Sequence, residues 1–422
     1  MFKEKLKLKQ KYLLEESKHF CILPWLHIHS VPNGNVSPCC ISYPGHFTGK
    51  VKSETRLMEL VNSDPMKQLR LNMVDDKPST ICKTCYNTEA IGGASFRQHS
   101  NKIYAQFYER AVSNSTEESG NLTEFKMNYF DFRFSTICNF KCRTCTSDYS
   151  SQWEQENVKH KKDYVPIRRE KSTPLLDDII EQIPNMHEAY FAGGEILITD
   201  EHYTLLENMI AKGKTDTILK YNTNLSVFNF KDKNLIDLWK QFKFPISIGG
   251  SLDHYGSRAE YLRHGTDWNK IADNIRYLKS NLGSKADLCY NTVLSVFNVL
   301  TLQDFYKNLV RENLYDPTID GVFSIYKISS PSYYSPHILN LEEKSYAIGQ
   351  IEQLINFFRL YRRDRNRFES IKKVLEDTIT FLKLDIDLSK EIDMFKQETL
   401  RLDQIRKENF VDIFPELKRL VE

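Results

Sequence analysis

The sequence predicts an α/β protein: a parallel sheet curved into a barrel or part of one, with a cysteine-rich segment before it and a helical extension after it. Three observations support this fold class. Short β-rich runs alternate with amphipathic helical patterns, and the last four strand starts lie roughly 30 to 40 residues apart, the length of a βαβ unit. Beyond Pro331 the pattern is helical. Eight of the nine cysteines lie before residue 146.

The β-rich runs define six expected strands in a chain of 422 residues, which is long enough for two or three units. They lie at 127–134, 188–192, 217–223, 244–251, 287–296 and 322–328. Between them, apolar residues recur on one helical face, as at Trp268, Ile271, Ile275 and Leu278. We therefore expect a partial barrel of six β/α units.

Composition divides the chain into four expected domains. The segment 111–123 is rich in Ser, Thr, Asn and Gly without an apolar period, which predicts a linker. A cysteine-containing domain at 1–110 precedes it. The barrel follows at 124–335, and a helical C-terminal extension occupies 336–422.

Charge and hydropathy exclude several classes of protein. With 58 Lys and Arg against 56 Asp and Glu, the chain has no strong overall field for nucleic acid or an anionic membrane. No apolar run approaches the roughly 18 residues of a membrane span. The basic start includes Glu4, Glu15 and Glu16 and lacks the apolar region of a secretory signal, so we expect a cytoplasmic protein. In reducing cytosol, nine cysteines favour metals or catalysis over disulfides.

The segment "CNFKCRTC" places Cys138, Cys142 and Cys145 directly after the first expected strand. Ligands this close together must wrap a compact centre, and barrel enzymes place their chemistry at the C-terminal ends of strands. Three thiolates on a four-iron cubane leave one iron free to bind a substrate. The alternatives are zinc with a remote fourth ligand and coincidental core thiols.

This C-x3-C-x2-C spacing after the first strand of a βα-repeat chain resembles the radical S-adenosylmethionine (SAM) superfamily. The resemblance implies that the three thiolates hold a 4Fe-4S cluster whose open iron chelates the amino and carboxylate groups of SAM. One electron from the cluster then cleaves SAM to methionine and a 5'-deoxyadenosyl radical. The implied fold is a partial (β/α)6 TIM-like barrel of the radical SAM type.

Two motifs downstream extend the resemblance. "FAGGEILI" follows the second strand and is similar to the family's GGE motif, which implies that Gly193, Gly194 and Glu195 bind the SAM ammonium. "YNTNLS" at the end of the third strand resembles the family's T-N-G turn. Asn224 matches it, whereas Leu225 replaces the glycine.

Further SAM-binding candidates follow the fourth strand. "SIGGSLDHYG" is similar to the family's S-L-D-G, which implies that Ser251 and Asp253 bind the ribose hydroxyls; a polar strand cap is the alternative. Arg263 is a candidate for the SAM carboxylate, because a guanidinium fork suits a carboxylate, and a surface ion pair is its alternative. Thr144 stands where the family often carries a bulky residue near adenine.

A second set of thiols precedes the barrel. Cys21, Gly34 and Cys39 give C-x12-G-x4-C, and Cys82 and Cys85 give C-x2-C. Four thiols can close a cluster, and the pattern resembles the twitch or SPASM auxiliary module, which accompanies many radical SAM enzymes that modify peptides. In most relatives that module follows the barrel. A zinc knuckle is the alternative, because the same ligands suit zinc.

Cys40 and Cys289 complete the nine cysteines. Cys40 is either a substitute ligand or a small buried residue. Cys289 lies on the fifth expected strand. If its side chain points into the barrel, it is a candidate catalytic residue that hands a hydrogen atom to a substrate radical, as in some peptide epimerases of this superfamily; otherwise it is a core cysteine.

Together these features predict a radical SAM enzyme, of unresolved reaction class, that abstracts hydrogen from a peptide or protein side chain. A second, auxiliary 4Fe-4S cluster relays an electron or anchors the substrate, and we expect a flavodoxin- or ferredoxin-type reductant. One alternative substrate is a nucleotide or small metabolite. The other alternative is a metal-stabilised nucleic-acid-binding protein without catalysis, with the basic segment 158–170 as its contact surface.

Overall fold

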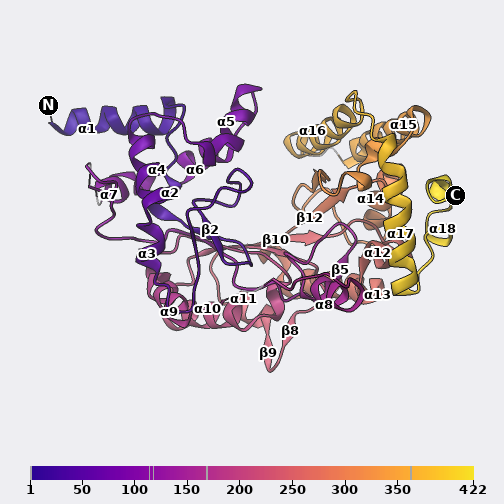
Figure 1. Cartoon of the computed structure of the whole chain (residues 1–422), viewed down its shortest axis with the longest axis horizontal. Coiled ribbons are helices and arrows are strands. Elements are labelled where there is room, and N and C mark those ends of the chain that lie inside the picture. The colour runs from indigo at the N-terminus through magenta and orange to yellow at the C-terminus, as the bar shows by residue number, and fades with distance from the viewer. Residues whose placement is uncertain (1, 114, 117, 168–169, 362–363) are drawn as a thin grey trace. The chain divides into compact units, whose positions relative to one another are not determined.

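The computed structural model describes residues 2–113, 115–116, 118–167, 170–361 and 364–422 (Figure 1). The chain forms two compact units. Unit 1 comprises Met1–Thr136, Val165–Lys220 and Gln241–Phe244, and unit 2 comprises Ile137–Tyr164, Tyr221–Lys240 and Pro245–Glu422. The expected linker 111–123 includes residues 114 and 117, and the basic segment 158–170 includes 168–169; these residues lie outside the described ones.

Unit 1 contains a sheet in which the strand order is β6-β4-β1-β2-β3. β4 (Tyr129–Phe132) pairs in parallel with β6 (Glu188–Phe191) and, on its other side, with β1 (His29–Ser30). β2 (Asn35–Ser37) and β3 (Gly49–Lys50) continue the sheet in antiparallel pairs. All four residues of β4 are buried, as is typical of a central parallel strand. The cysteine-rich segment therefore joins the first expected barrel strand through β1.

The described part of unit 1 also contains several helices. They are α1 (Phe2–Lys11), α2 (Leu23–Leu26), α3 (Leu57–Val61), α4 (Asp64–Val74), α5 (Lys83–Ala90), α6 (Phe96–Ile103), α7 (Tyr108–Ser113), α9 (Thr173–Gln182) and α10 (Asp200–Ala211). The buried guanidinium of Arg70 in α4 donates hydrogen bonds to the carbonyls of Gly120, Pro24 and Val61, at 2.7, 3.0 and 2.7 Å. Because Gly120 is one of its acceptors, the segment 111–123 is tied to α4; the four expected domains stay a prediction.

Unit 2 contains β10 (Ile246–Ser251), which pairs in parallel with β12 (Ala286–Leu294), which in turn pairs in parallel with β13 (Ser324–Lys327). β7 (Ile218–Thr223) begins in unit 1 and ends in unit 2 along the chain. Before the C-terminal extension, the described part of unit 2 contains the helices α8 (Ser151–His160), α11 (Leu235–Trp239), α12 (Gly256–Leu262), α13 (Trp268–Leu282) and α14 (Leu302–Arg311). Each of the six expected strands is present, which confirms the α/β fold class.

The C-terminal extension is helical, as the sequence predicts. It contains α15 (Leu341–Phe358), α16 (Arg365–Leu382), α17 (Ile392–Arg406) and α18 (Phe410–Ile413), drawn in orange to yellow in Figure 1. Phe395, Phe410 and Phe414 pack around Phe297, which follows β12, with ring centroids 5.5, 6.0 and 5.6 Å away. The extension therefore shares a core with the strands of unit 2. Among the described helices, none is long and apolar enough to cross a membrane.

Candidate functional site

The five cysteines before the barrel all lie in unit 1, and their thiols influence one another electrostatically. Burial raises the pKa of Cys21, and the neighbouring thiols of Cys82 and Cys85 raise it further. Burial likewise raises the pKa of Cys39, with contributions from Cys40 and Cys21, and that of Cys82, with contributions from Cys39 and Cys85. These interactions connect the four thiols that the sequence spacing predicts as one ligand set, and through Cys39 they also reach Cys40; the ligand set stays a prediction.

The backbone around this set is fixed by α5 and α6. Cys82 ends a 3-10 turn and Cys85 lies in the first turn of α5, three residues later, so both face the same side. Arg97 in α6 donates to the carbonyl of Phe20, beside Cys21, at 2.8 Å. Burial disfavours the charged thiolate form of these cysteines, whereas iron binds only thiolates. A bound cationic centre would supply the positive charge that stabilises the deprotonated thiols, so their burial is compatible with such a centre.

Cys40 has different surroundings from the four-thiol set. Burial and Asp131 raise the pKa of its thiol to about 12, against the opposing charge of Arg133. Burial would raise the pKa of Asp131, but ion pairs with His29 (3.1 Å) and Arg133 (3.3 Å) hold it at about 2. This buried charge cluster at the end of β4 was not predicted. The only feature of the sequence that indicates this cluster is that Asp131 and Arg133 alternate with aromatic residues in the expected strand.

The three-cysteine loop lies in unit 2, where backbone pairing holds it. β5 (Lys141–Cys142) pairs antiparallel with β11 (Arg263–His264), with Cys142 opposite Arg263. The next residue, Gly265, has φ +106°, and a Cβ on it would lie 2.9 Å from the Asn139 carbonyl oxygen. Glycine is therefore required where β11 approaches the loop. On the other side, Trp153 in α8 donates its indole N–H to the Cys142 carbonyl at 2.7 Å.

Three of the expected SAM-binding residues reach this loop from different elements. Asn224, after β7, donates its side-chain amide to Asn139 Oδ1 at 2.9 Å. Arg263 Nη1 lies 3.8 Å from Cys142 Sγ, and Arg263 Nε pairs at 2.9 Å with Asp253, which follows β10. Residues from two strand ends and from β11 thus gather around the cysteines.

The electrostatics of the loop suit thiolate ligands beside a cation. Burial raises the pKa of Cys142, and the positive charge of Arg263 opposes this. Burial, with a smaller contribution from Cys142, raises the pKa of Cys145 to about 12. No three His, Cys, Asp or Glu side chains in the described part of the chain are arranged to hold a single metal ion. In a cubane, each iron takes its own thiolate, so the ligands surround the cluster instead of converging.

The structure places the remaining candidates of unit 2 as follows. Leu225, which replaces the glycine of the T-N-G turn, has φ +61°, so the turn keeps the left-handed geometry that glycine favours. Ser251 is the last residue of β10, and Thr144 lies half-buried within the loop. Cys289 on β12 is half-buried, and burial with Asp287 raises its pKa to about 11. The roles expected for these residues stay predictions.

The GGE segment lies in unit 1, directly after β6. Gly193 has φ +98°, and a Cβ on it would lie 3.0 Å from the Arg133 side chain. Gly194 also has a positive φ, +55°. Glu195 is buried, and its Oε1 accepts the backbone N–H of Leu197 at 3.2 Å, which caps the following 3-10 turn. Binding of an ammonium group by these residues stays a prediction.

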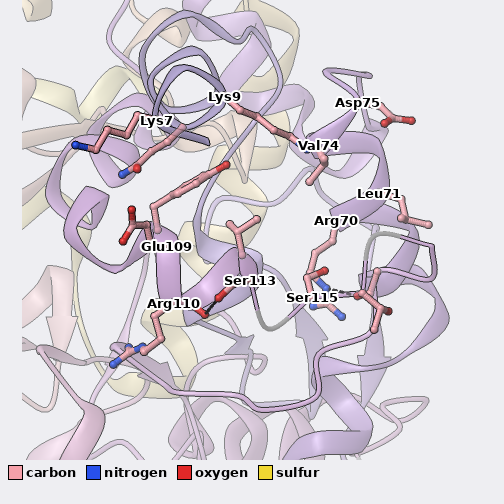
Figure 2. Close-up of a pocket in the computed structure, with 15 residues that line it drawn as sticks. Lys7, Lys9, Arg70, Leu71, Val74, Asp75, Glu109, Arg110, Ser113 and Ser115 are labelled. Atoms are coloured by element: carbon pink, nitrogen blue, oxygen red, sulfur yellow. Dashed lines mark hydrogen bonds between the residues drawn. The ribbon is translucent and has the colours of Figure 1, made fainter. Parts of the chain in front are cut away.

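Several cavities lie within the described part of unit 1. Figure 2 shows one of about 920 Å³, which is lined by residues of α1, α4 and α7 and by Ser115, Thr116 and Gly120; no cysteine of the described chain lines it. Another, of about 220 Å³, is lined in part by Cys40, Glu188, Tyr190 and Lys220. The 920 Å³ cavity is therefore separate from the thiols, whereas the 220 Å³ cavity reaches Cys40.

The three thiols in the loop after the first long strand and the thiols that precede it form a pattern that resembles a radical SAM enzyme with an auxiliary iron-sulfur module. Comparison with protein families supports the auxiliary module. The model of the SPASM domain, an iron-sulfur cluster-binding domain, matches residues 21–86, which begin at Cys21 and include Cys85. The match confirms a SPASM-like module before the barrel and the expectation of an iron-sulfur cofactor in it. No curated protein matches the chain.

Several solved structures resemble the chain. They include anSMEcpe with bound AdoMet (17% identity, 53% of this chain and 58% of that chain, TM-score 0.37) and SuiB of Streptococcus suis bound to S-adenosylmethionine (13%, 72% and 63%, 0.34). Another is TYW1 with a lysine-pyruvate adduct bound (15%, 55% and 70%, 0.27). The chain thus spans 58% of the length of anSMEcpe. Likenesses at these TM-scores are too weak to carry an argument about function.

Proposed function

We propose that this protein cleaves SAM reductively and uses the resulting radical to abstract hydrogen from a peptide or protein side chain. The observation that carries the proposal is the gathering of Asn224, Asp253 and Arg263 at the three-cysteine loop, which each was expected to approach on sequence grounds alone. A chance grouping of core thiols would not bring these particular residues to one place.

Cys138, Cys142 and Cys145 would hold the SAM-binding 4Fe-4S cluster, which when bound supplies the electron for SAM cleavage and an open iron for its amino acid group. Arg263 carries a partly buried positive charge beside Cys142, which suits the SAM carboxylate. Asp253 orients this guanidinium through their ion pair. Asn224 supports the loop through Asn139.

The substrate class rests on the SPASM-like module, because modules of this type accompany radical SAM enzymes that modify peptides. Cys21, Cys39, Cys82 and Cys85 would hold a second 4Fe-4S cluster there, which relays an electron or anchors the substrate. A flavodoxin- or ferredoxin-type protein would supply the reducing electron. A nucleotide or small metabolite is the second candidate substrate.

The proposal is tested with anaerobically purified full-length protein, SAM and dithionite. We expect 5'-deoxyadenosine from the parent protein and none from Cys142→Ala, whereas both proteins keep the iron of the auxiliary set. Zinc in place of iron, or no 5'-deoxyadenosine from protein that contains both clusters, would refute the proposal. Mass spectrometry of co-expressed candidate peptides then decides the substrate class: a mass change that depends on Cys142 supports a peptide, and turnover of a nucleotide instead would overturn it.

A further inference from the structure

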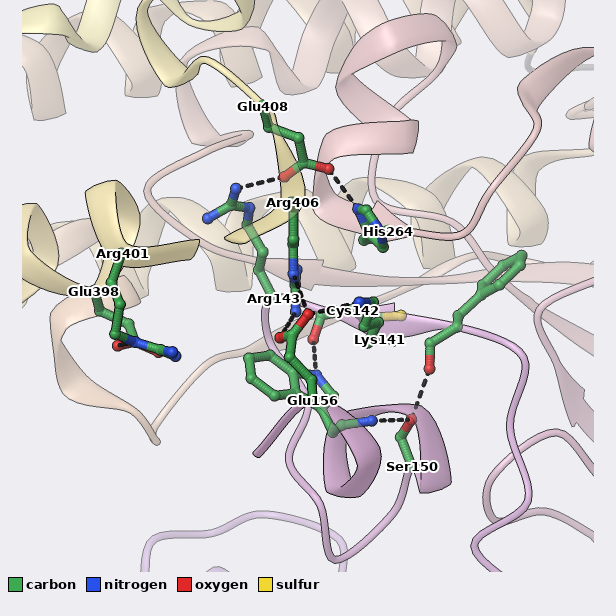
Figure 3. Close-up of polar contacts among 12 residues, drawn as sticks. Lys141, Cys142, Arg143, Ser150, Glu156, His264, Glu398, Arg401, Arg406 and Glu408 are labelled. Carbon is green, nitrogen blue, oxygen red and sulfur yellow. Dashed lines mark hydrogen bonds and ion pairs between the residues drawn. The ribbon is translucent and has the colours of Figure 1, made fainter. Parts of the chain in front are cut away.

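Two cationic side chains, Lys141 and Arg143, flank Cys142 in the cysteine loop, and each is held by acidic residues from elsewhere in unit 2 (Figure 3). The acids that bind Arg143 come from the C-terminal extension, about which the sequence motifs say nothing. We propose that the end of α17 is a positioning element for this loop, and that it sets the geometry in which the loop holds its cluster. The role of the loop itself rests on the proposed function.

Arg143 is the first anchor, and its side chain is fully buried. Arg143 Nη2 contacts Asp403 Oδ1 at 2.6 Å and Glu408 Oε2 at 2.7 Å. Its guanidinium carbon lies 3.7 Å from the ring centroid of Tyr261, whose hydroxyl donates to the same Asp403 oxygen at 2.7 Å. A planar cation that is stacked on a ring and bound by two carboxylates has a single position. The backbone between Cys142 and Cys145 is fixed with it.

The two acids are themselves held by the turn that ends α17. Lys407 adopts the left-handed conformation, φ +58°, which ends the helix and presents Glu408. Asp403 Oδ2 accepts the backbone N–H of Phe410 at 2.7 Å, and His264 Nδ1 lies 2.6 Å from Glu408 Oε1. Burial would raise the pKa of Glu408, but His264 and Arg143 hold it below its ordinary value, so it is charged at neutral pH.

Arg406 forms the second anchor, on the other side of Cys142. It donates to both carboxylate oxygens of Glu156, at 2.9 and 3.2 Å, and Glu156 also binds Lys141 at 2.6 Å. The Arg406 guanidinium carbon lies 4.7 Å from the ring centroid of Trp153, which donates to the Cys142 carbonyl. These bonds hold the pKa of Glu156 at about 2, although burial would raise it. We call the two anchors together the α17 clamp.

Buried ion pairs of this kind contribute little net stability compared with apolar residues of the same volume, because both charges lose their hydration. Their clear effect is on position, since removal of one partner leaves the other charge buried without its counter-charge. The clamp holds the backbone on both sides of Cys142. Its loss would therefore free the ligands of the cluster before it unfolds the unit.

The test is hydrogen exchange of the full-length protein as purified, followed by mass spectrometry of peptides that cover 137–149. In Asp403→Asn we expect exchange of these peptides to accelerate by about tenfold or more, because the loop opens locally while the rest of unit 2 stays folded. The matched control is Glu398→Gln, which removes an acid of the same helix whose partner is Arg401, at 2.6 Å. Loop exchange in Asp403→Asn that equals exchange in the control would overturn the proposal.

A second variant covers the case in which Asp403→Asn fails to fold. Glu408→Gln removes the more exposed acid of the pair, and we expect a smaller increase in the same peptides. The functional readout is the electron paramagnetic resonance (EPR) spectrum of the reduced cluster: SAM should perturb it less in the clamp variants, and the KM for SAM should rise more than kcat falls. Arg143→Lys keeps the charge but loses the fork and the stacking, so it should show the same weaker EPR change and the same higher KM for SAM as the acid variants.

The outcomes separate the two proposals. If the parent protein makes no 5'-deoxyadenosine, the proposed function fails, but the exchange experiment still decides whether α17 positions the loop. If the parent is active and Asp403→Asn matches the parent in loop exchange, EPR response and KM for SAM, the clamp is refuted and the proposed function stands.

Discussion

Substitution of Gly265 by alanine tests the close approach of β11 to the cysteine loop. Gly265 has φ +106°, and a Cβ there would lie 2.9 Å from the Asn139 carbonyl oxygen and 3.1 Å from Phe140 Cδ1. The unfavourable backbone conformation costs about 1–3 kcal/mol. The overlap with the loop adds about 1–3 kcal/mol, the usual cost of overpacking. The free energy of unfolding should therefore fall by about 2–6 kcal/mol, the sum of the two terms.

Gly283→Ala is the matched control in the same unit. Gly283 also has a positive φ, +53°, but no atom lies within 4 Å of the position of its Cβ. We therefore expect a loss of only about 1–3 kcal/mol. Denaturant unfolding followed by circular dichroism measures both losses, and iron content with the SAM-dependent EPR change reports on the loop. We expect reduced iron and a weaker EPR change in Gly265→Ala alone. Equal losses of stability and unchanged iron in both variants would refute the reasoning.

Three further predictions concern single residues. Leu225→Gly relieves about 1 kcal/mol of strain from the left-handed backbone, but it removes a fully buried side chain that contributes about 2–5 kcal/mol. Denaturant unfolding should therefore show a net loss in the free energy of unfolding, and an unchanged midpoint would contradict this packing. Burial, and next the charge of Arg258, lower the pKa of His254 to about 3 in the folded state. Between about pH 6.5 and 3, His254 is then protonated only in the unfolded chain. The free energy of unfolding should therefore fall as the pH is lowered, by up to about 1.4 kcal/mol per pH unit. His254→Gln should flatten that slope in urea melts at pH 7 and 5. Cys82→Ala should remove the auxiliary iron, about four atoms per chain, whereas Cys40→Ala should retain it by metal analysis; equal iron in the two would argue against the four-thiol set.

The six strands and the SPASM-like module could be predicted because their signals are local. β-branched and aromatic runs define strands such as β7 and β10, and the observed bounds lie within a few residues of the expected ones. Cysteine spacing similarly predicts that Cys82 and Cys85 act together, because residues three apart face one side of a helical turn. The match of the SPASM domain to residues 21–86 confirms this type of module.

The contacts of the charged residues could not be predicted, because they depend on the tertiary fold. Arg143 and Asp403 are separated by 260 residues, and nothing in a solvated-looking helix such as α17 indicates which of its acids turns inward. The pairing of β1 with β4 is equally remote from any local pattern. Leu225 shows the opposite limit: its residue type argues against a left-handed turn, yet the fold imposes φ +61° on it.

The pairing of Asp253 with Arg263 changes what each residue can do. Asp253 Oδ1 accepts the backbone N–H of Val293 at 2.8 Å, and Oδ2 pairs with Arg263 Nε at 2.9 Å, so both carboxylate oxygens already have partners. A ribose hydroxyl would have to share one of them. A guanidinium has five N–H donors, and Asp253 engages only the Nε end, so the Nη groups remain beside Cys142. This geometry favours Asp253 as the residue that orients Arg263, and Arg263 as the one that meets an anionic ligand at the loop.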